Sequence, residues 1–185
     1  MLGGKGALAP EDMSRLRHRT SPGCTYFVTT DAWQNRAIFR VREVAEIVTQ
    51  RIISCRDEGS YLLHEFVLMP NHLHLLLTPA SNTSLERAIQ LIKGGGSHQI
   101  HKQLGHKMQI WQPGFHEWTV RDSRDYAARR EYIRMNPVVA KLVNRPEEWP
   151  YSSASGRFPL DDVPQGLKPL RPVGWGDVGA EAPTP

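Results

Sequence analysis

Cysteine is scarce in this sequence, and long hydrophobic runs are missing from it. The 185 residues include two cysteines, Cys24 and Cys55, which cannot build a disulfide framework and do not have the spacing of a zinc site. No apolar run approaches the roughly 18 residues that a membrane-spanning helix needs, and the first residues are too poor in apolar side chains for a secretory signal. We therefore expect a cytoplasmic protein with no membrane partner.

Internal repeats are also missing, and 39% of the residues are hydrophobic, as in an ordinary globular chain. A chain of this length can bury the core of one domain. We predict a flexible N-terminal arm over residues 1–20, one domain over residues 21–156, and an extended tail over residues 157–185. This tail is rich in Pro, Gly and Asp and has no periodic pattern.

The excess of positive charge is modest, with a net charge of +4 and a pI of about 9.3. Such an excess is compatible with nucleic-acid binding. Its distribution is more informative, because arginines crowd one segment of the chain. These are Arg121, Arg124, Arg129, Arg130 and Arg134. A solvated helix face has the same appearance, but we predict a phosphate-binding surface, with Lys93 as a further contact.

Two histidines stand two residues apart within the apolar run 68–77. Because successive side chains on a strand point to opposite faces, His72 and His74 would share one face, and Leu73 and Leu75 the other. Two imidazoles side by side are suitable ligands for a divalent metal. Two polar residues on the wet face of a half-buried strand would give the same pattern, so the pair alone leaves both interpretations open.

A second stretch, residues 123–137, has the composition of a helix that Ser123 caps and Pro137 stops. Positions four apart on a helix lie one above the other, so Tyr132 and Asn136 would face the same way. Since the residue before a proline is pushed away from helical angles, we expect Asn136 on a fraying last turn.

Together these two stretches resemble a known family. The run Pro-Asn-His-Leu-His at residues 70–74 is similar to the His-hydrophobic-His motif of single-tyrosine transposases of the insertion-sequence 200 type. The segments 132–143 and 149–154 resemble the subgroup associated with repetitive extragenic palindromes (REP). The resemblance runs from about Tyr26 to Ser155, which is most of the chain.

This resemblance implies a ferredoxin-like core and a DNA-cleaving activity. It implies cleavage and strand transfer of single-stranded or hairpin DNA through a 5′-phosphotyrosine, with Tyr132 as the nucleophile. It further implies that His72 and His74 bind Mg²⁺ or Mn²⁺, and that Asn136 is the third ligand. The oligomeric state stays open between a monomer and a homodimer.

The order of predicted elements is strand, helix, strand, strand, helix, strand, helix. This order is typical of an α+β sandwich with a mainly antiparallel sheet and helices on one face. The expected strands cover residues 25–30, 61–69, 72–78 and part of 110–120, and the first two helices begin at residues 41 and 84. We expect the run Gly94–Gly96 to interrupt the second helix, as a break, a flexible kink or a close approach of the backbone to phosphate, and we assign it no role.

Several other residues have alternative roles. Tyr126 is a rival nucleophile, but it lacks an Asn or Gln four residues later, so we predict that it packs. His64 and His116 are either close to the metal site or purely structural. Three aromatic residues could stack on bases but are predicted to pack in the core: Trp111, Phe115 and Trp118.

Three rival functions compete with this one. A histidine-triad nucleotide hydrolase is rejected, because Leu76 stands where a third alternating histidine would be. A domesticated DNA-binding protein would keep the fold without cleaving DNA, and the presence of all four candidate site residues argues against it. An RNA-binding or structural module has no signature in this sequence.

Overall fold

The computed structural model describes residues 21, 23–105, 107–164 and 167. The predicted N-terminal arm and most of the predicted tail therefore lie outside the described residues. The order of elements matches the prediction. In chain order they are β1 (Tyr26–Asp31), α1 (Arg42–Asp57), β2 (Tyr61–Leu68), β3 (His72–Pro79), α2 (Leu85–Leu104), β4 (His116–Thr119) and α3 (Ser123–Val139).

The four strands form one antiparallel sheet in the order β2-β3-β1-β4. Strands β2 and β3 form a hairpin around Pro70 and Asn71, and β1 pairs with the other side of β3. In this register His74 lies opposite Thr29 of β1 and Val67 of β2. The histidine pair is therefore held on an inner strand, where neighbouring strands on both sides fix its position.

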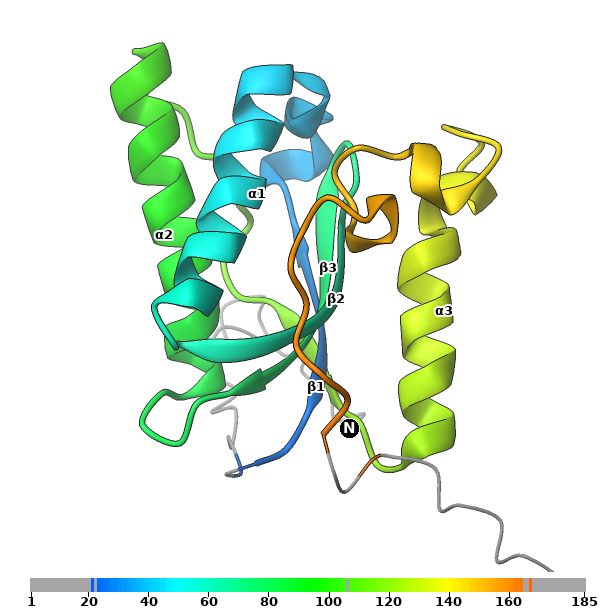
Figure 1. The fold of residues 1–185 in the computed structure, drawn as a ribbon. Coiled ribbons are helices and arrows are strands. Elements are labelled where there is room, and N and C mark those ends of the chain that lie inside the picture. Colours follow the sequence, from blue (N-terminus) through cyan, green and yellow to red (C-terminus); the bar gives the residue numbers. More distant parts are fainter. Residues whose placement is uncertain (1–20, 22, 106, 165–166, 168–185) are drawn as a thin grey trace, which may run out of the picture.

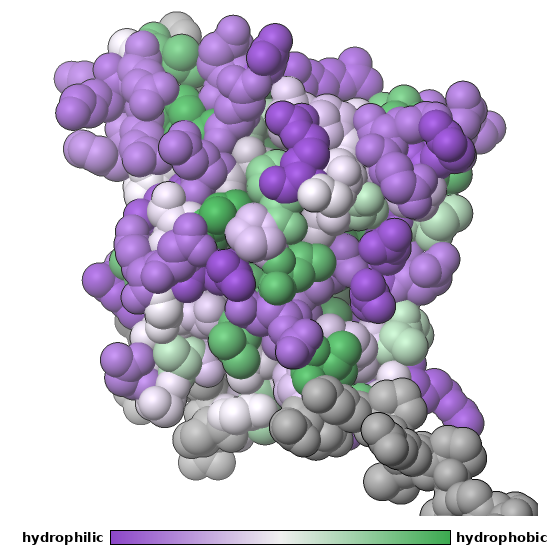
Figure 2. All heavy atoms as spheres, in the orientation of Figure 1, coloured by the Kyte–Doolittle hydropathy of each residue, from purple (hydrophilic) through white to green (hydrophobic). Residues whose placement is uncertain are grey.

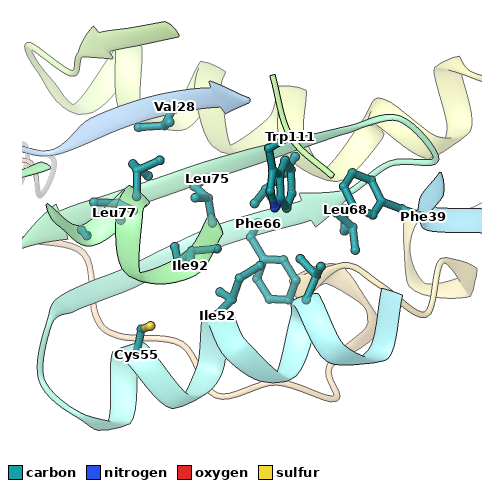
Figure 3. Close-up of a cluster of buried hydrophobic side chains, with 14 of the residues drawn as sticks. Val28, Phe39, Ile52, Cys55, Phe66, Leu68, Leu75, Leu77, Ile92 and Trp111 are labelled. Atoms are coloured by element: carbon teal, nitrogen blue, oxygen red, sulfur yellow. The ribbon is translucent and has the colours of Figure 1, made fainter. Parts of the chain in front are cut away.

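Helices α1 and α2 cover one face of the sheet (Figure 1). The apolar positions of α1 recur at helical spacing, and Val48, Ile52 and Cys55 are buried against the sheet. Leu75 and Leu77 of β3 point into the same core, as Figure 3 shows together with Ile52 and Cys55. This face holds the larger of the two apolar cores.

Helix α3 lies on the opposite face of the sheet (Figure 1). The α+β class with an antiparallel sheet is confirmed, but the helices do not share one face as expected. Nearly every residue of β2 and β3 is buried, so the sheet has two faces to cover. Tyr126 and Ile133 of α3 supply the second cover and pack against Val67 and Leu76.

Helix α2 continues through Gly94–Gly96, so the expected break was wrong. Its surroundings explain why, because α2 packs along α1 and a Cβ added at Gly96 would lie 3.8 Å from Val48. Tertiary packing thus outweighs the low helix propensity of glycine. Within the described part of the chain, none of the helices, α2 included, is long and apolar enough to cross a membrane.

Both expected ends of α3 need correction. Asp122, rather than Ser123, is the N-cap, and its side chain accepts a hydrogen bond from the backbone N–H of Asp125. Pro137 lies inside the helix, which continues to Val139. A proline near the end of a helix removes one donor but leaves the preceding turns intact. Asn136 is consequently a helical residue one regular turn from Tyr132.

After α3 the chain returns to the edge of β2. Ser152 forms a bridge with Val67, and the N–H of Leu68 donates to the carbonyl of Tyr151 at 2.9 Å. Further on, Asp161 and Leu63 share two hydrogen bonds, one between backbone groups at 2.8 Å and one to the Asp161 carboxylate at 2.7 Å. On the face shown in Figure 2, hydrophobic side chains reach the surface between α1 and α3, where this segment crosses.

Candidate active site

His72 and His74 lie on the face of β3 that α3 covers, with ring centroids 4.7 Å apart. Each ring is held by a hydrogen bond at Nδ1, to Asn71 Oδ1 for His72 and to Thr29 Oγ1 for His74, both at 2.8 Å. The ring of His74 also stacks on Phe27 at 5.4 Å. Both imidazoles are thus oriented by neighbours, as ligand histidines are.

Tyr132 of α3 lies against this pair from the other side. Its ring centroid is 5.2 Å from that of His74 and 5.8 Å from that of Phe27. The side chain is nevertheless 51% exposed, so a substrate can reach it. The fold therefore brings together a tyrosine and a histidine pair that are far apart in the sequence, and it does so within one chain.

The donor set of the two histidines fits a divalent metal. Burial lowers the pKa of His74 to about 3, with a further contribution from His72. Burial also lowers the pKa of His72, against an opposing effect of Asp31. Both rings are therefore neutral near pH 7, as metal ligands must be. Among the described residues, Nε2 of His74 is buried and has no hydrogen-bond partner, so its lone pair is available to a ligand when Nδ1 donates to Thr29 Oγ1.

A third ligand would have to come from another residue type. The described part of the chain contains no group of three His, Cys, Asp or Glu side chains that could hold a metal. The half-buried Asn136 follows Tyr132 by one turn of α3, so it is the candidate of the required kind. An amide oxygen is a donor that both Mg²⁺ and Mn²⁺ accept.

The two flanks of α3 have different neighbours. Residues 129, 132 and 136 are three and four positions apart and share one flank. Arg129 and Tyr132 of this flank both lie against Phe27. On the other flank, Arg130 donates to Glu65 at 2.9 Å, and Arg134 lies 3.9 Å from the same carboxylate. We call these the tyrosine flank and the glutamate flank.

This division separates the arginines that were predicted to bind DNA. Arg130 and Arg134 partner a fully buried carboxylate, which also accepts a hydrogen bond from Ser153. Their role in DNA binding stays a prediction, and their position favours a structural role. Arg129 lies beside Tyr132, and Arg121 and Arg124 are exposed near the start of the helix.

Lys93 belongs to the opposite layer of the molecule. Its ammonium group donates to the carbonyls of Gln112 at 2.7 Å and Gly114 at 2.5 Å. Burial lowers its pKa to about 8. These contacts fasten α2 to the loop before β4, so a contact of Lys93 with DNA stays a prediction without support from its position.

The other aromatic residues divide between core and surface. Trp111 is buried and packs on Phe39 with ring centroids 4.7 Å apart, and Phe115 packs partly buried against the same core. Trp118 was wrongly predicted to be a core residue, since its side chain is 47% exposed. It lies on the short edge strand β4 directly opposite Phe27.

Tyr126 is a packing residue, as predicted. It is buried, burial raises the pKa of its hydroxyl, and its ring meets that of His64 at 5.9 Å. His64 is itself buried and bonded to Thr78 at 2.9 Å, which makes it structural. His116 is exposed on β4 opposite Thr29.

Sequence reasoning did not identify Phe27, Thr29 and Glu65 as parts of the site. Alternation along β1 could have placed Phe27 and Thr29 on one face. Only the register of β1 on β3 brings that face beside His74. Glu65 carried a weaker signal, a lone carboxylate within an apolar strand, which requires a buried partner.

Comparisons with known proteins agree with this geometry. Residues 23–136 match the model of the family described as Transposase IS200 like. The chain is 28% identical over 155 residues to the REP-associated tyrosine transposase of Escherichia coli K12, covering 80% of this chain and 90% of that one. It is 32% identical over 151 residues to a putative REP-associated tyrosine transposase of Haemophilus influenzae, covering 76% and 85%.

The chain is also similar to the solved structure of a REP-associated tyrosine transposase bound to a REP hairpin. It superimposes with a TM-score of 0.63 at 25% sequence identity, over 80% of this chain and 90% of that chain. The family match over residues 23–136 includes the whole sheet and the part of α3 that carries Tyr132 and Asn136.

Proposed function

Because the chain belongs to the IS200-like transposase family, and within it to the REP-associated tyrosine transposases, we propose that it cuts and rejoins single-stranded DNA through Tyr132. A tyrosine transposase is a DNA-cleaving enzyme. The proposal adds to this the nucleophile, the metal ligands and the kind of DNA on which the enzyme acts.

The observation that carries the proposal is the meeting of Tyr132 with His74. An exposed phenol lies against an oriented, neutral imidazole whose Nε2 has no partner among the described residues. The rival phenol of Tyr126 is buried under α3 and cannot reach a phosphate. The arrangement thus offers one accessible nucleophile beside one candidate metal site.

The proposed chemistry is the transfer of a phosphodiester from DNA to Tyr132 and back. The phenol oxygen attacks phosphorus and forms a bond to the 5′ phosphate, while the bond to the 3′ oxygen breaks. The phenol proton passes to solvent, and the departing 3′ oxygen gains a proton. Because the phosphotyrosine keeps the bond energy, a free 3′-OH can later displace the tyrosine without a nucleotide cofactor.

The residues that would hold the metal are His72, His74 and Asn136. A Mg²⁺ or Mn²⁺ ion there would polarise the scissile phosphate and orient it for attack. Imidazole ligands favour Mn²⁺ over Mg²⁺. The chain itself contributes two hydrogen bonds that hold the imidazoles in place: His72 Nδ1 donates to Asn71 Oδ1, and His74 Nδ1 is bonded to Thr29 Oγ1.

The proposed substrate is a REP-like hairpin with single-stranded flanks. A REP hairpin is bound in the structure of the similar transposase, and this chain has the partly exposed Arg129 beside Tyr132 and the exposed Arg121 and Arg124 near the start of α3. Arg121, Arg124 and Arg129 would contact phosphates on this surface. We expect these contacts with the DNA backbone to contribute to affinity and not to select the DNA sequence.

The test is the formation of a covalent adduct. The protein is incubated with hairpin DNA and Mn²⁺, and an SDS-stable complex is sought. Tyr132→Phe removes one oxygen and keeps the ring, so it should abolish the adduct and leave DNA affinity within a few-fold. Tyr126→Phe is the matched control and should leave the adduct intact. His74→Ala, or removal of the metal with a chelator, should prevent cleavage while the fold persists.

The adduct also decides between the two candidate functions. A phosphotyrosine mapped to position 132 supports the enzyme proposed here. Cleavage that persists in Tyr132→Phe would mean that water or another side chain attacks. Binding of the hairpin without any adduct in the unmodified chain, under all metal conditions, would instead identify a DNA-binding protein of the same fold.

A further inference from the structure

Trp118 is an exposed aromatic residue beside the candidate active site. With 47% of its side chain open to solvent, it is among the most exposed large hydrophobic residues of the described chain. It lies on β4, an edge strand, on the face that α3 covers only in part. The proposed reaction gives this tryptophan no role.

Two guanidinium groups flank the indole ring. Arg129 lies 5.0 Å from its centroid and Arg121 lies 5.6 Å from it. Arg129 also lies 5.1 Å from the ring of Phe27. Its Nε is bonded to Asp125 at 3.1 Å, which fixes the guanidinium in this position. Both guanidinium groups lie over the indole ring, so this place combines an aromatic π-system with positive charge, and a nucleotide combines a flat base with a negative phosphate.

The same contacts connect Trp118 with the proposed nucleophile. Arg129 lies between Trp118 and Phe27, and Phe27 meets the ring of Tyr132 at 5.8 Å. The distances from Arg129 to the two rings, 5.0 Å and 5.1 Å, are both shorter than the 5.8 Å between Phe27 and Tyr132. A strand with one phosphate at Tyr132 therefore needs only a few nucleotides to reach Trp118, since stacked bases are about 3.4 Å apart along one strand.

We propose that Trp118 is a stacking platform for one unpaired base of the DNA strand whose phosphate lies at Tyr132, with Arg121 and Arg129 on the neighbouring phosphates. This inference rests on the proposed function, because it takes the position of the strand from Tyr132. Trp118 acts here as a positioning residue. It fixes which phosphate of the flank reaches the nucleophile and takes no part in the chemistry.

The experiment combines substitutions in the protein with removal of single bases. The DNA is a synthetic hairpin with single-stranded flanks on both sides, together with a set in which each flank nucleotide in turn is abasic. The proteins are the full chain, Trp118→Ala, Trp118→Leu and Trp118→Phe. Leu62→Ala is the matched control, because Leu62 is an equally exposed apolar residue, 48%, on the other edge strand. Affinity and adduct yield are measured on the same samples.

Trp118→Ala should weaken binding of the intact DNA roughly 5- to 150-fold, which corresponds to the loss of one stacked base. Trp118→Leu should weaken it similarly, because it keeps bulk without a π-face, whereas Trp118→Phe should restore most of the affinity. At one flank position, removal of the base should weaken binding of the unmodified protein by the same factor. On that abasic DNA, Trp118→Ala should cause no further loss of affinity. Leu62→Ala should bind like the parent, and thermal unfolding should be unchanged in all variants.

Two results would overturn the platform. One is a Trp118→Ala protein that binds the intact hairpin as tightly as the parent. The other is a loss of affinity in Trp118→Ala that is equal on the intact DNA and on every abasic DNA. If either result is found while the parent still forms its adduct, the platform fails and the proposed function survives. If the parent forms no adduct, but one abasic position still removes the effect of Trp118→Ala on affinity, the proposed function fails and the platform survives.

Discussion

At the residue scale, Glu65 connects three parts of the fold. Its carboxylate is fully buried, accepts a hydrogen bond from Ser153 and is paired with Arg130 at 2.9 Å. A buried charge is strongly destabilising unless it is paired. The arginine and the hydroxyl therefore offset the cost of burying this carboxylate. Helix α3 is thereby fastened to β2 two residues before the proposed nucleophile.

Removal of Arg130 should consequently reduce stability. We expect Arg130→Ala to lower the free energy of unfolding by about 1–3 kcal/mol, since it leaves a charged acceptor short of a partner and half of the arginine side chain is exposed. Chemical denaturation measures this loss. Arg124→Ala, at an exposed position of the same helix, should change it little.

The cause can be separated in a double-mutant cycle. Glu65→Gln removes the buried charge, so Arg130→Ala should be much less destabilising in that background. If Arg130→Ala is as destabilising in the Glu65→Gln background as beside the natural carboxylate, packing of the arginine stem, and not its charge, holds α3 in place.

Residue-scale prediction from sequence succeeded where the pattern is local. The alternation of His72 and His74 and the turn between Tyr132 and Asn136 follow from the geometry of one element each. The partner of Arg130 and the exposure of Trp118 depend on which face α3 covers, and no local pattern carries that information.

At the scale of elements, the glycines of α2 differ in their surroundings. A Cβ at Gly94 would meet nothing within 4 Å, whereas one at Gly95 would lie 2.6 Å from Nε of Arg51. That arginine crosses from α1 and donates to the carbonyl of Leu91 at 3.1 Å. Gly95 therefore makes room for a contact between the two helices, and Gly94 does not.

Alanine substitutions should separate the two positions. Gly94→Ala should raise the free energy of unfolding by about 0.5–1 kcal/mol through helix propensity alone. Gly95→Ala should leave the free energy of unfolding unchanged or lower it, because Arg51 must move and give up its hydrogen bond. Denaturant titration of both variants measures this, and equal stabilisation of the two would show that Arg51 moves without loss of stability.

The carboxylate of Asp161 helps to hold the segment after residue 156 against β2. Burial alone would raise the pKa of Asp161, but hydrogen bonds from Arg56 and from the N–H of Leu63 outweigh it and hold the pKa below the usual value of 3.8. The stabilisation is therefore fully present above that pH and is lost as the pH falls through the lower folded value.

Hydrogen exchange of the Leu63 amide should report this loss. We expect its protection to be constant above about pH 4 and to decline below it, beyond the intrinsic change in exchange rate. Asp161→Ala should remove the protection at every pH, and Asp162→Ala, at the exposed neighbour, should not. Unchanged protection in Asp161→Ala would mean that the backbone bond suffices.

Element boundaries show where sequence reasoning reaches its limit. The existence and order of the strands and helices were predictable from periodicity and turn residues. Gly94–Gly96 and Pro137 were interpreted as breaks because local propensity disfavours helix there. Packing of α2 on α1, and the late position of Pro137 in α3, allow this fold to tolerate those penalties.

At the scale of the whole molecule, positive charge is divided between two faces of the sheet. Arg121, Arg124 and Arg129 lie on the side of α3, and Lys102 lies on α2 across the sheet. Function as a transposase was predictable because two short motifs resemble a family. The face that would contact DNA was not, since it depends on where α3 lies.

DNA binding should depend steeply on salt. Each phosphate contact releases counterions, so affinity for hairpin DNA should fall strongly between low and physiological ionic strength, and single strands or hairpins should be preferred over plain duplex. Arg129→Ala should reduce the slope of log affinity against log salt by about 1, while Lys102→Ala should leave it unchanged. The opposite order of these two slopes would mean that DNA binds the other face.

The separation of α3 into a tyrosine flank and a glutamate flank has a consequence inside a cell. The ion pair between Arg130 and Glu65 lies on one flank and the proposed nucleophile on the other, so loss of the Tyr132 hydroxyl should leave the proposed DNA-binding surface intact. A chain damaged in this way would still occupy the sites of intact copies. A Tyr132→Phe chain should therefore be dominant-negative, because it competes with active copies for the same DNA sites.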